Sequence, residues 1–92
     1  MNEGLFLIEQ ILSSKNRIRI LKYLLAKEKA NITMISRELN IHHLNAIEHL
    51  VFLEKKGIVR RKKYGKVTIF SLNNSNPIVY SLKKFLEEIG EI

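Results

Sequence analysis

Positively charged side chains are concentrated in one short segment of the sequence, residues 55–66. The chain has 16 Lys and Arg residues against 9 acidic residues, which gives a formal net charge of +7. The segment holds seven of these bases and no acid, so the remainder of the chain is neutral; they are Lys55, Lys56, Arg60, Arg61, Lys62, Lys63 and Lys66. Bases bind phosphates because neutralising a phosphate releases its condensed counterions. The clustering predicts contact with a nucleic-acid backbone, although charge runs are more often solvated surface.

A second group of side chains that form hydrogen bonds precedes the basic segment. It consists of His42, His43, Asn45, Glu48 and His49. The amide of Asn45 can pair with both N6 and N7 of adenine, and the Glu48 carboxylate can accept from N4 of cytosine or repel phosphate. His42 and His43 suit a phosphate contact near a helix start, or capping and solvation alone. Because the chain has no Cys and no Asp, we predict no metal site at these histidines.

The composition excludes several classes of protein. The absence of Cys removes disulfides and thiolate chemistry and fits a reducing, cytoplasmic location. The sequence has no phosphate-binding glycine loop and no His–carboxylate pair at catalytic spacing, so we predict no enzyme activity and no cofactor. No apolar run approaches the ~18 residues of a membrane span, and no signal-peptide pattern is evident, so we expect no membrane partner.

The elements that must position these side chains are predicted from apolar spacing and capping residues. Helices are expected at about 3–12, from Ser13 or Ser14, from Asn31 or Thr33 to Asn40, at about 42–56, and at about 77–90. Runs rich in β-branched and aromatic residues, 58–64 and 66–72, predict a hairpin that turns near Gly65. The short joint between the third and fourth helices is typical of a helix-turn-helix, whose second helix enters the major groove of DNA.

The fold class that follows is mainly α with a small β-hairpin wing, in the order helix, helix, helix, helix, hairpin, helix. Residues 1–92 are expected to form a single winged helix-turn-helix domain, since 92 residues leave room for one domain. The recognition helix is then the one at about 42–56, and the wing lies at about 58–72.

Four segments of the chain match a known pattern in order and spacing. They are residues 16–24 in the second helix, 41–53 in the recognition helix, 57–60 at its end, and 65–72 in the wing. Together they resemble the ArsR-like winged helix-turn-helix regulators of bacteria and archaea. The resemblance implies a homodimeric transcriptional regulator that binds double-stranded DNA sequence-specifically. On a wing that follows a recognition helix, the predicted phosphate contacts are Arg60, Arg61, Lys62, Lys63 and Lys66. Residues 34–39 lack the cysteines of the family's metal sensors, so metal sensing is not implied and any effector stays unknown.

Apolar side chains at the two ends of the chain exceed what a small winged-helix core needs. They are Leu5, Phe6, Ile8, Ile78, Leu82, Phe85, Leu86 and Ile89. These side chains can cover the core of one protomer or, as the resemblance implies, form a two-fold dimer interface. A dimer is favoured because so short a chain buries only about 60% of its unfolded surface. It would place two recognition helices about 34 Å apart and predicts a palindromic site.

Some assignments remain open at the level of sequence. Leu44 and Val51 are expected in the core, whereas Ile47 fits either the core or a contact with a thymine methyl group. Tyr64, at the wing tip, can contact a phosphate, enter the minor groove or pack on the hairpin. The alternative function is a winged-helix module that binds protein or RNA without operator-specific DNA binding, because a fold does not determine a function.

Overall fold

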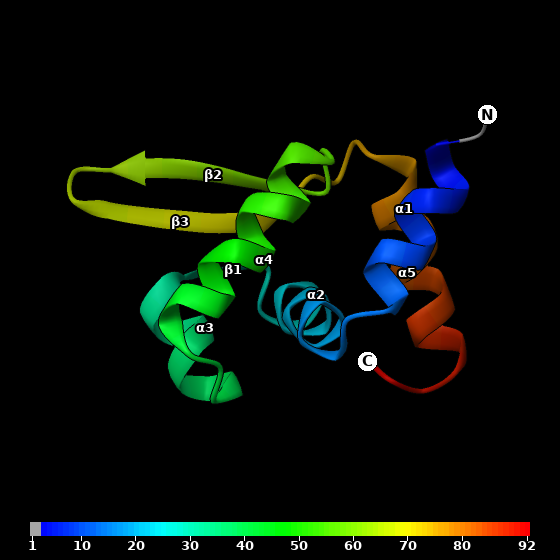
Figure 1. Cartoon of the computed structure of the whole chain (residues 1–92), viewed down its shortest axis with the longest axis horizontal. Coiled ribbons are helices and arrows are strands. Elements are labelled where there is room, and N and C mark those ends of the chain that lie inside the picture. Colours follow the sequence, from blue (N-terminus) through cyan, green and yellow to red (C-terminus); the bar gives the residue numbers. More distant parts are fainter. Residues whose placement is uncertain (1–2) are drawn as a thin grey trace.

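A computed structural model describes the backbone of residues 3–92 and the side chains of residues 8–92. The described chain forms five helices and three strands (Figure 1). In order they are α1 (Glu3–Leu12), α2 (Lys15–Lys27), β1 (Lys29–Asn31), α3 (Ile32–Leu39), α4 (His43–Lys55), β2 (Val59–Tyr64), β3 (Val67–Leu72) and α5 (Pro77–Glu88). The predicted class, mainly α with a hairpin between the fourth and fifth helices, is confirmed.

Polar residues at the helix ends explain where the helices begin and end. The side chain of Asn31 accepts a hydrogen bond from the Met34 N–H at 2.8 Å and caps α3. Asn40 ends α3 with a φ of 54°, a left-handed conformation that asparagine tolerates better than most residues. Asn76 caps α5 in the same way as Asn31 caps α3, and Pro77 follows where a missing N–H breaks no helical bond. These caps lie where the sequence predicts them.

The turn between α3 and α4 is held by two hydrogen bonds that cross it. The Ile41 N–H donates to the Ser36 carbonyl at 3.0 Å. The Ser36 hydroxyl donates in return to the Ile41 carbonyl at 2.6 Å. Because Ile41 is also buried, the turn is anchored in the core, and the two helices form the predicted helix-turn-helix.

The sheet has one strand more than the predicted hairpin. Its strands are all antiparallel, in the order β1-β3-β2. Strand β1 has only three residues, and Ala30 lies opposite Phe70 of β3. A run this short shows no alternation of apolar and polar residues, so only the pairing with β3 defines it as a strand.

The core lies where α2, α3 and α4 meet the near end of the sheet. Its largest fully buried side chains are Ile11, Ile20, Leu24, Ile35, Leu50, Leu53, Ile58 and Val59. Phe70 and Leu72 are buried on one face of β3, and Ala46, Leu50 and Leu53 on one face of α4, as predicted.

The prediction that Leu44 belongs to the core is wrong. Its side chain is 64% exposed. Leu44 precedes the buried Ala46 by two residues, which places it about 200° away around the helix, on the outer face. Val51, which was expected in the core with it, is half-buried.

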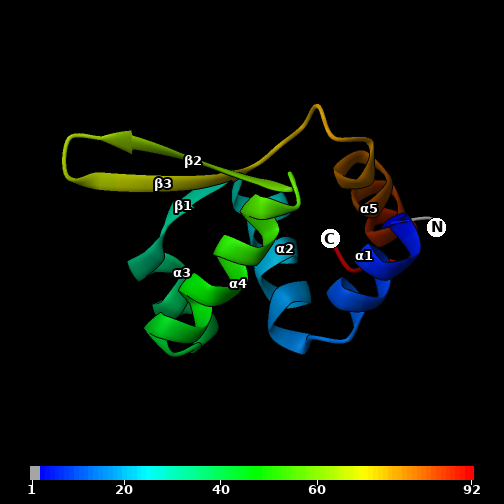
Figure 2. The same cartoon turned by 45° about the horizontal axis from the view of Figure 1, so that its top comes forward.

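The hairpin of β2 and β3 and the pair of terminal helices lie at opposite ends of the molecule. In Figures 1 and 2 the hairpin extends away from the helices, whereas α1 and α5 run side by side at the far end. Helix α2 lies between the two ends. Within the described residues, no helix is long and apolar enough to cross a membrane.

Candidate nucleic-acid interface

The bases of the wing lie on a hairpin that is open to solvent on both faces. We call residues 60–66 the basic wing. In β2, Val59 is buried and every later residue is exposed, because the strand extends past the helices (Figure 2). Side chains on both faces of the strand therefore reach solvent, including the predicted phosphate contacts Lys62 and Lys63, and Lys66 is exposed in the turn that follows. None of these three lysines forms an ion pair with the side chains described from residue 8 onward.

Arg61 differs from these lysines because it has a carboxylate partner within the protein. Its Nε donates to both carboxylate oxygens of Glu54 at 3.0 Å, and an Nη–Oε distance of 2.9 Å completes the ion pair. The guanidinium also lies 5.2 Å from the centroid of the Phe70 ring. Arg61 thus joins the end of α4 to the wing and has its charge compensated there. Its predicted phosphate contact requires it to share or leave Glu54.

Arg60 and Tyr64 lie on the other face of β2. Arg60 donates to the Ser75 hydroxyl at 3.3 Å, an exposed contact that a phosphate can readily replace. Tyr64 is exposed at the wing tip, and the Lys62 ammonium lies 5.4 Å from its ring centroid. Packing of Tyr64 on the hairpin is therefore limited, and the ring is accessible to a ligand.

The first turn of α4 is capped by a histidine. His42 Nδ1 accepts a hydrogen bond from the Leu44 N–H at 3.2 Å. Because Nδ1 accepts, the proton of the neutral ring is on Nε2, which is then available as a donor. The predicted capping role of His42 is thus present, and a phosphate contact through Nε2 remains compatible with it. His43, Asn45 and Glu48 are all exposed on the same helix.

His49 is half-buried and faces α2 instead of solvent. Its Nδ1 accepts a hydrogen bond from Arg17 Nε at 3.2 Å. The Arg17 guanidinium lies 3.8 Å from the centroid of the Phe52 ring and donates to the Gln10 carbonyl at 2.8 Å. Burial, and next the nearby Arg17 charge, lower the pKa of His49 below its ordinary value of 6.5. This contact gives His49 a structural role, while its predicted DNA contact stays a prediction. No local pattern could have revealed Arg17, which is 32 residues away.

The three histidines do not come together as metal ligands. In the part of the chain that the structure describes, no group of three or more His, Asp or Glu side chains is placed to hold a metal ion.

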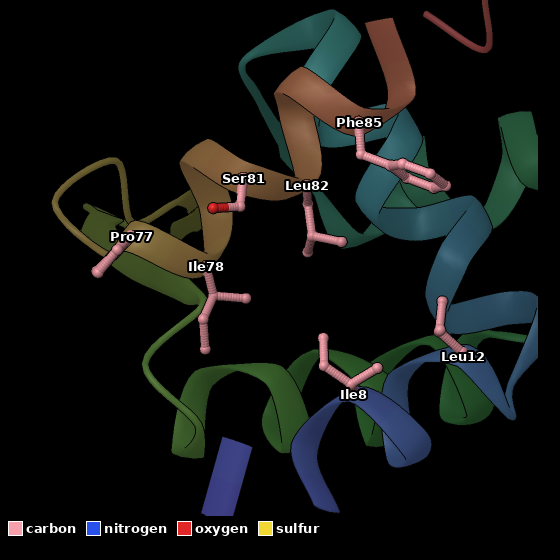
Figure 3. Close-up of a pocket in the computed structure, with 7 residues that line it drawn as sticks. All are labelled: Ile8, Leu12, Pro77, Ile78, Ser81, Leu82 and Phe85. Atoms are coloured by element: carbon pink, nitrogen blue, oxygen red, sulfur yellow. The ribbon is translucent and has the colours of Figure 1, made fainter. Parts of the chain in front are cut away.

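A second surface, at the opposite end of the molecule, is apolar. A groove of about 390 Å³ lies between α1 and α5 and is lined by Ile8, Leu12, Pro77, Ile78, Ser81, Leu82 and Phe85. Figure 3 shows side chains of the two helices pointing toward one another across it. Leu12 and Phe85 are 57% and 54% exposed, and Ile89 is exposed beside them.

Not every predicted interface residue lies on this surface. Leu86 is 8% exposed and therefore already buried within one protomer, where it leaves little area for a partner. Leu5 and Phe6 lie outside the residues whose side chains the structure describes. Leu12 and Ser81 also line the groove, but the sequence did not predict them as interface residues. The spacing of Leu12 fits a core position equally well, and a serine is not apolar.

Solved structures with the same arrangement of elements bear on the identity of the fold. PagR of Bacillus anthracis, a transcriptional repressor, superposes with a TM-score of 0.75 at 24% identity over 91% of this chain and 93% of that chain. The transcriptional regulator HlyU from Vibrio vulnificus does so with a TM-score of 0.78 at 17% identity over 95% and 88%. The fold is a winged helix-turn-helix. This confirms the predicted class, in which α4 is the second helix of the helix-turn-helix and β2–β3 is the hairpin that follows it.

A third neighbour adds a description of assembly. Mb0332 from Mycobacterium bovis, described as a homodimeric winged helix-turn-helix DNA-binding domain and a possible ArsR-family regulator, has a TM-score of 0.75 at 18% identity. The match covers 97% of this chain and 80% of that chain. No family model and no curated protein matches the chain by sequence.

Proposed function

We propose that the protein is a homodimeric regulator of transcription that binds double-stranded DNA at specific sequences. The observation that carries the proposal is the position of the basic wing, which directly follows the recognition helix of a helix-turn-helix. Lys62, Lys63 and Lys66 are exposed and unpaired within the described side chains, so they can neutralise backbone phosphates. Such a regulator acts in the cytoplasm, where the DNA of bacteria and archaea lies.

In this arrangement α4 and the wing have different tasks. Helix α4 enters the major groove, where Asn45 and Glu48 reach base edges. The wing follows the backbone, because its cations are not tied to one base sequence. The first turn of α4 carries a capping histidine whose free nitrogen can donate to a phosphate.

The apolar groove between α1 and α5 supports the two-fold interface of the proposed dimer. Ile8, Leu12 and Phe85 are large, apolar and exposed, which is costly in a monomer and favourable when a second copy covers them. The interface lies at the opposite end from the wing (Figure 1), so dimerisation leaves both basic surfaces free. The homodimeric state described for Mb0332 agrees with this.

Fluorescence anisotropy with a labelled duplex tests DNA binding. We expect binding at low salt, and we expect log K to fall linearly with log salt, by about 0.9 per phosphate contacted. Selection from random-sequence DNA should then enrich a palindrome with half-sites about one helical turn apart. Absence of binding at low salt, or binding without salt dependence, contradicts the proposal. Purification with a stoichiometric protein or RNA partner and no DNA affinity favours the interaction-module alternative.

A further inference from the structure

The outer face of the recognition helix presents aliphatic side chains where polar ones would be expected. Leu44 is 64% exposed and Ile47 is 36% exposed. They are three residues apart and therefore neighbours on the helix surface. Neither belongs to the core cluster, which occupies the face of Ala46 and Leu50. The two side chains together form a small apolar surface that a ligand can contact.

The position of this aliphatic pair coincides with the part of α4 that meets bases. Residues near the N-terminus of a recognition helix contact base edges in the major groove. Leu44 lies in the first turn of α4, immediately after the locked turn that contains Ile41. Asn45 and Glu48, both exposed, flank it.

The scarcity of bases in α4 restricts which DNA bases its N-terminal turns can recognise. The helix has no Lys or Arg before Lys55, so the commonest specific contact, a bidentate one from Arg or Lys to guanine, is absent there. The apolar group that DNA exposes to aliphatic side chains in the major groove is the 5-methyl group of thymine. Asn45 suits the adenine of an A·T pair.

We infer that Leu44, together with Ile47, reads thymine methyl groups, so that the half-site has A·T pairs under the first two turns of α4. The inference rests on the proposed function and specifies its base recognition. The aliphatic pair lies on the helix that leads into the basic wing, and the charge of the wing fits a polyanion and not an apolar protein surface. Burying Leu44 against methyl groups removes apolar area from water while Lys62, Lys63 and Lys66 hold the backbone.

Replacing thymine by deoxyuridine tests the inference, because it removes the methyl group and leaves base pairing and phosphates intact. The full chain is first used to select its preferred duplex, and each half-site thymine is then replaced in turn. We expect at least one replacement to weaken binding of the unaltered protein by about fourfold, the effect of losing one buried methyl-sized group. Leu44→Ala should abolish the preference for thymine at one or more of these positions, whereas Leu44→Met should restore it.

Tyr80→Ala serves as the matched control, because Tyr80 is also 64% exposed but lies on α5. It should keep the full preference for thymine. Leu44→Ala should remain folded by circular dichroism, since an exposed helical position accepts alanine. If the protein binds DNA with salt dependence but no replacement weakens binding, or Leu44→Ala keeps the preference at every thymine, methyl recognition by Leu44 is wrong and the proposed function stands. If the unaltered protein shows no salt-dependent binding to DNA, both the methyl contact and the proposed function are contradicted. An apolar protein partner that Leu44→Ala releases while DNA affinity is unchanged overturns the inference.

Discussion

The wing end and the terminal-helix end of the molecule differ in almost every surface property. The basic wing is charged and narrow, and it is held to the body through Arg61 and Glu54. The groove between α1 and α5 is apolar, with Ser81 as the polar residue of its lining. Both surfaces belong to a protein of 39 × 30 × 24 Å. Their separation means that a polyanion and a second copy of the chain can be bound at the same time without competition.

In the proposed function, the same difference makes a net charge of +7 favour oriented binding. Cations spread over a surface attract DNA in many orientations, whereas cations on one projecting hairpin favour a single orientation. In the proposed dimer, the groove then sets the distance between two such hairpins.

The largest effect is expected from a charge placed in the apolar groove. Phe85→Glu puts a carboxylate into the proposed interface and should convert the dimer to a monomer. Losing the second half-site should weaken binding to a palindromic duplex by about 10²–10⁴-fold. Sedimentation measures the oligomeric state and anisotropy the affinity, with Tyr80→Ala on the same helix as the control. A Phe85→Glu protein that remains dimeric would place the interface elsewhere.

A smaller but still large effect is expected at the opposite end. Replacing Lys62, Lys63 and Lys66 by Ala should reduce affinity for every duplex by about 10²-fold at 0.15 M salt and reduce the salt slope by about 2.7. The matched control is Lys83→Ala with Lys84→Ala, which removes exposed bases from α5. Equal losses in the two variants would mean that charge acts without regard to location.

The ion pair between Glu54 and Arg61 predicts a gain of affinity. Glu54→Gln removes a negative charge beside the wing and releases the Arg61 guanidinium for a phosphate. We expect DNA affinity to rise about fivefold at 0.15 M salt, the value of one added phosphate contact. Stability should fall by no more than about 1 kcal/mol, because the pair is partly exposed. In Glu54→Gln with Arg61→Ala the gain should disappear, and persistence of the gain would mean that Arg61 does not contact DNA.

The smallest effect is the pH dependence that His49 contributes to stability. The folded protein holds the pKa of His49 below 6.5, so the unfolded chain binds a proton more readily. Neutral His49 therefore makes its full contribution to the free energy of unfolding above about pH 6.5. This contribution is lost as the pH falls through the lower pKa of the folded state. Urea midpoints at pH 5 and pH 7.5 should differ more for the unaltered protein than for His49→Gln. His43→Gln, at an exposed position, should retain the full pH dependence, and an identical response of the two variants would contradict the assignment.

The order of elements and the helix ends were predictable from sequence because their causes are local. Asn31, Asn40 and Asn76 act on backbone groups within a few residues, and apolar spacing defines the inner face of each helix. The basic wing was predictable as well, since its charges are consecutive in the chain. The short strand β1 was missed because three residues carry no periodic signal, and its partner lies about forty residues downstream.

Within the candidate sites, the tertiary structure decided which predicted residues are free to act. In the folded protein Arg61 forms an ion pair with Glu54, and His49 accepts a hydrogen bond from Arg17. Leu44 lies on the outer face of α4, although leucine is more often a core residue. The sequence by itself determined where the charge lies, the order of the helices and the class of fold. Pairing between distant side chains and the exposure of one apolar residue depend on how the helices pack, and that packing depends on the whole chain at once.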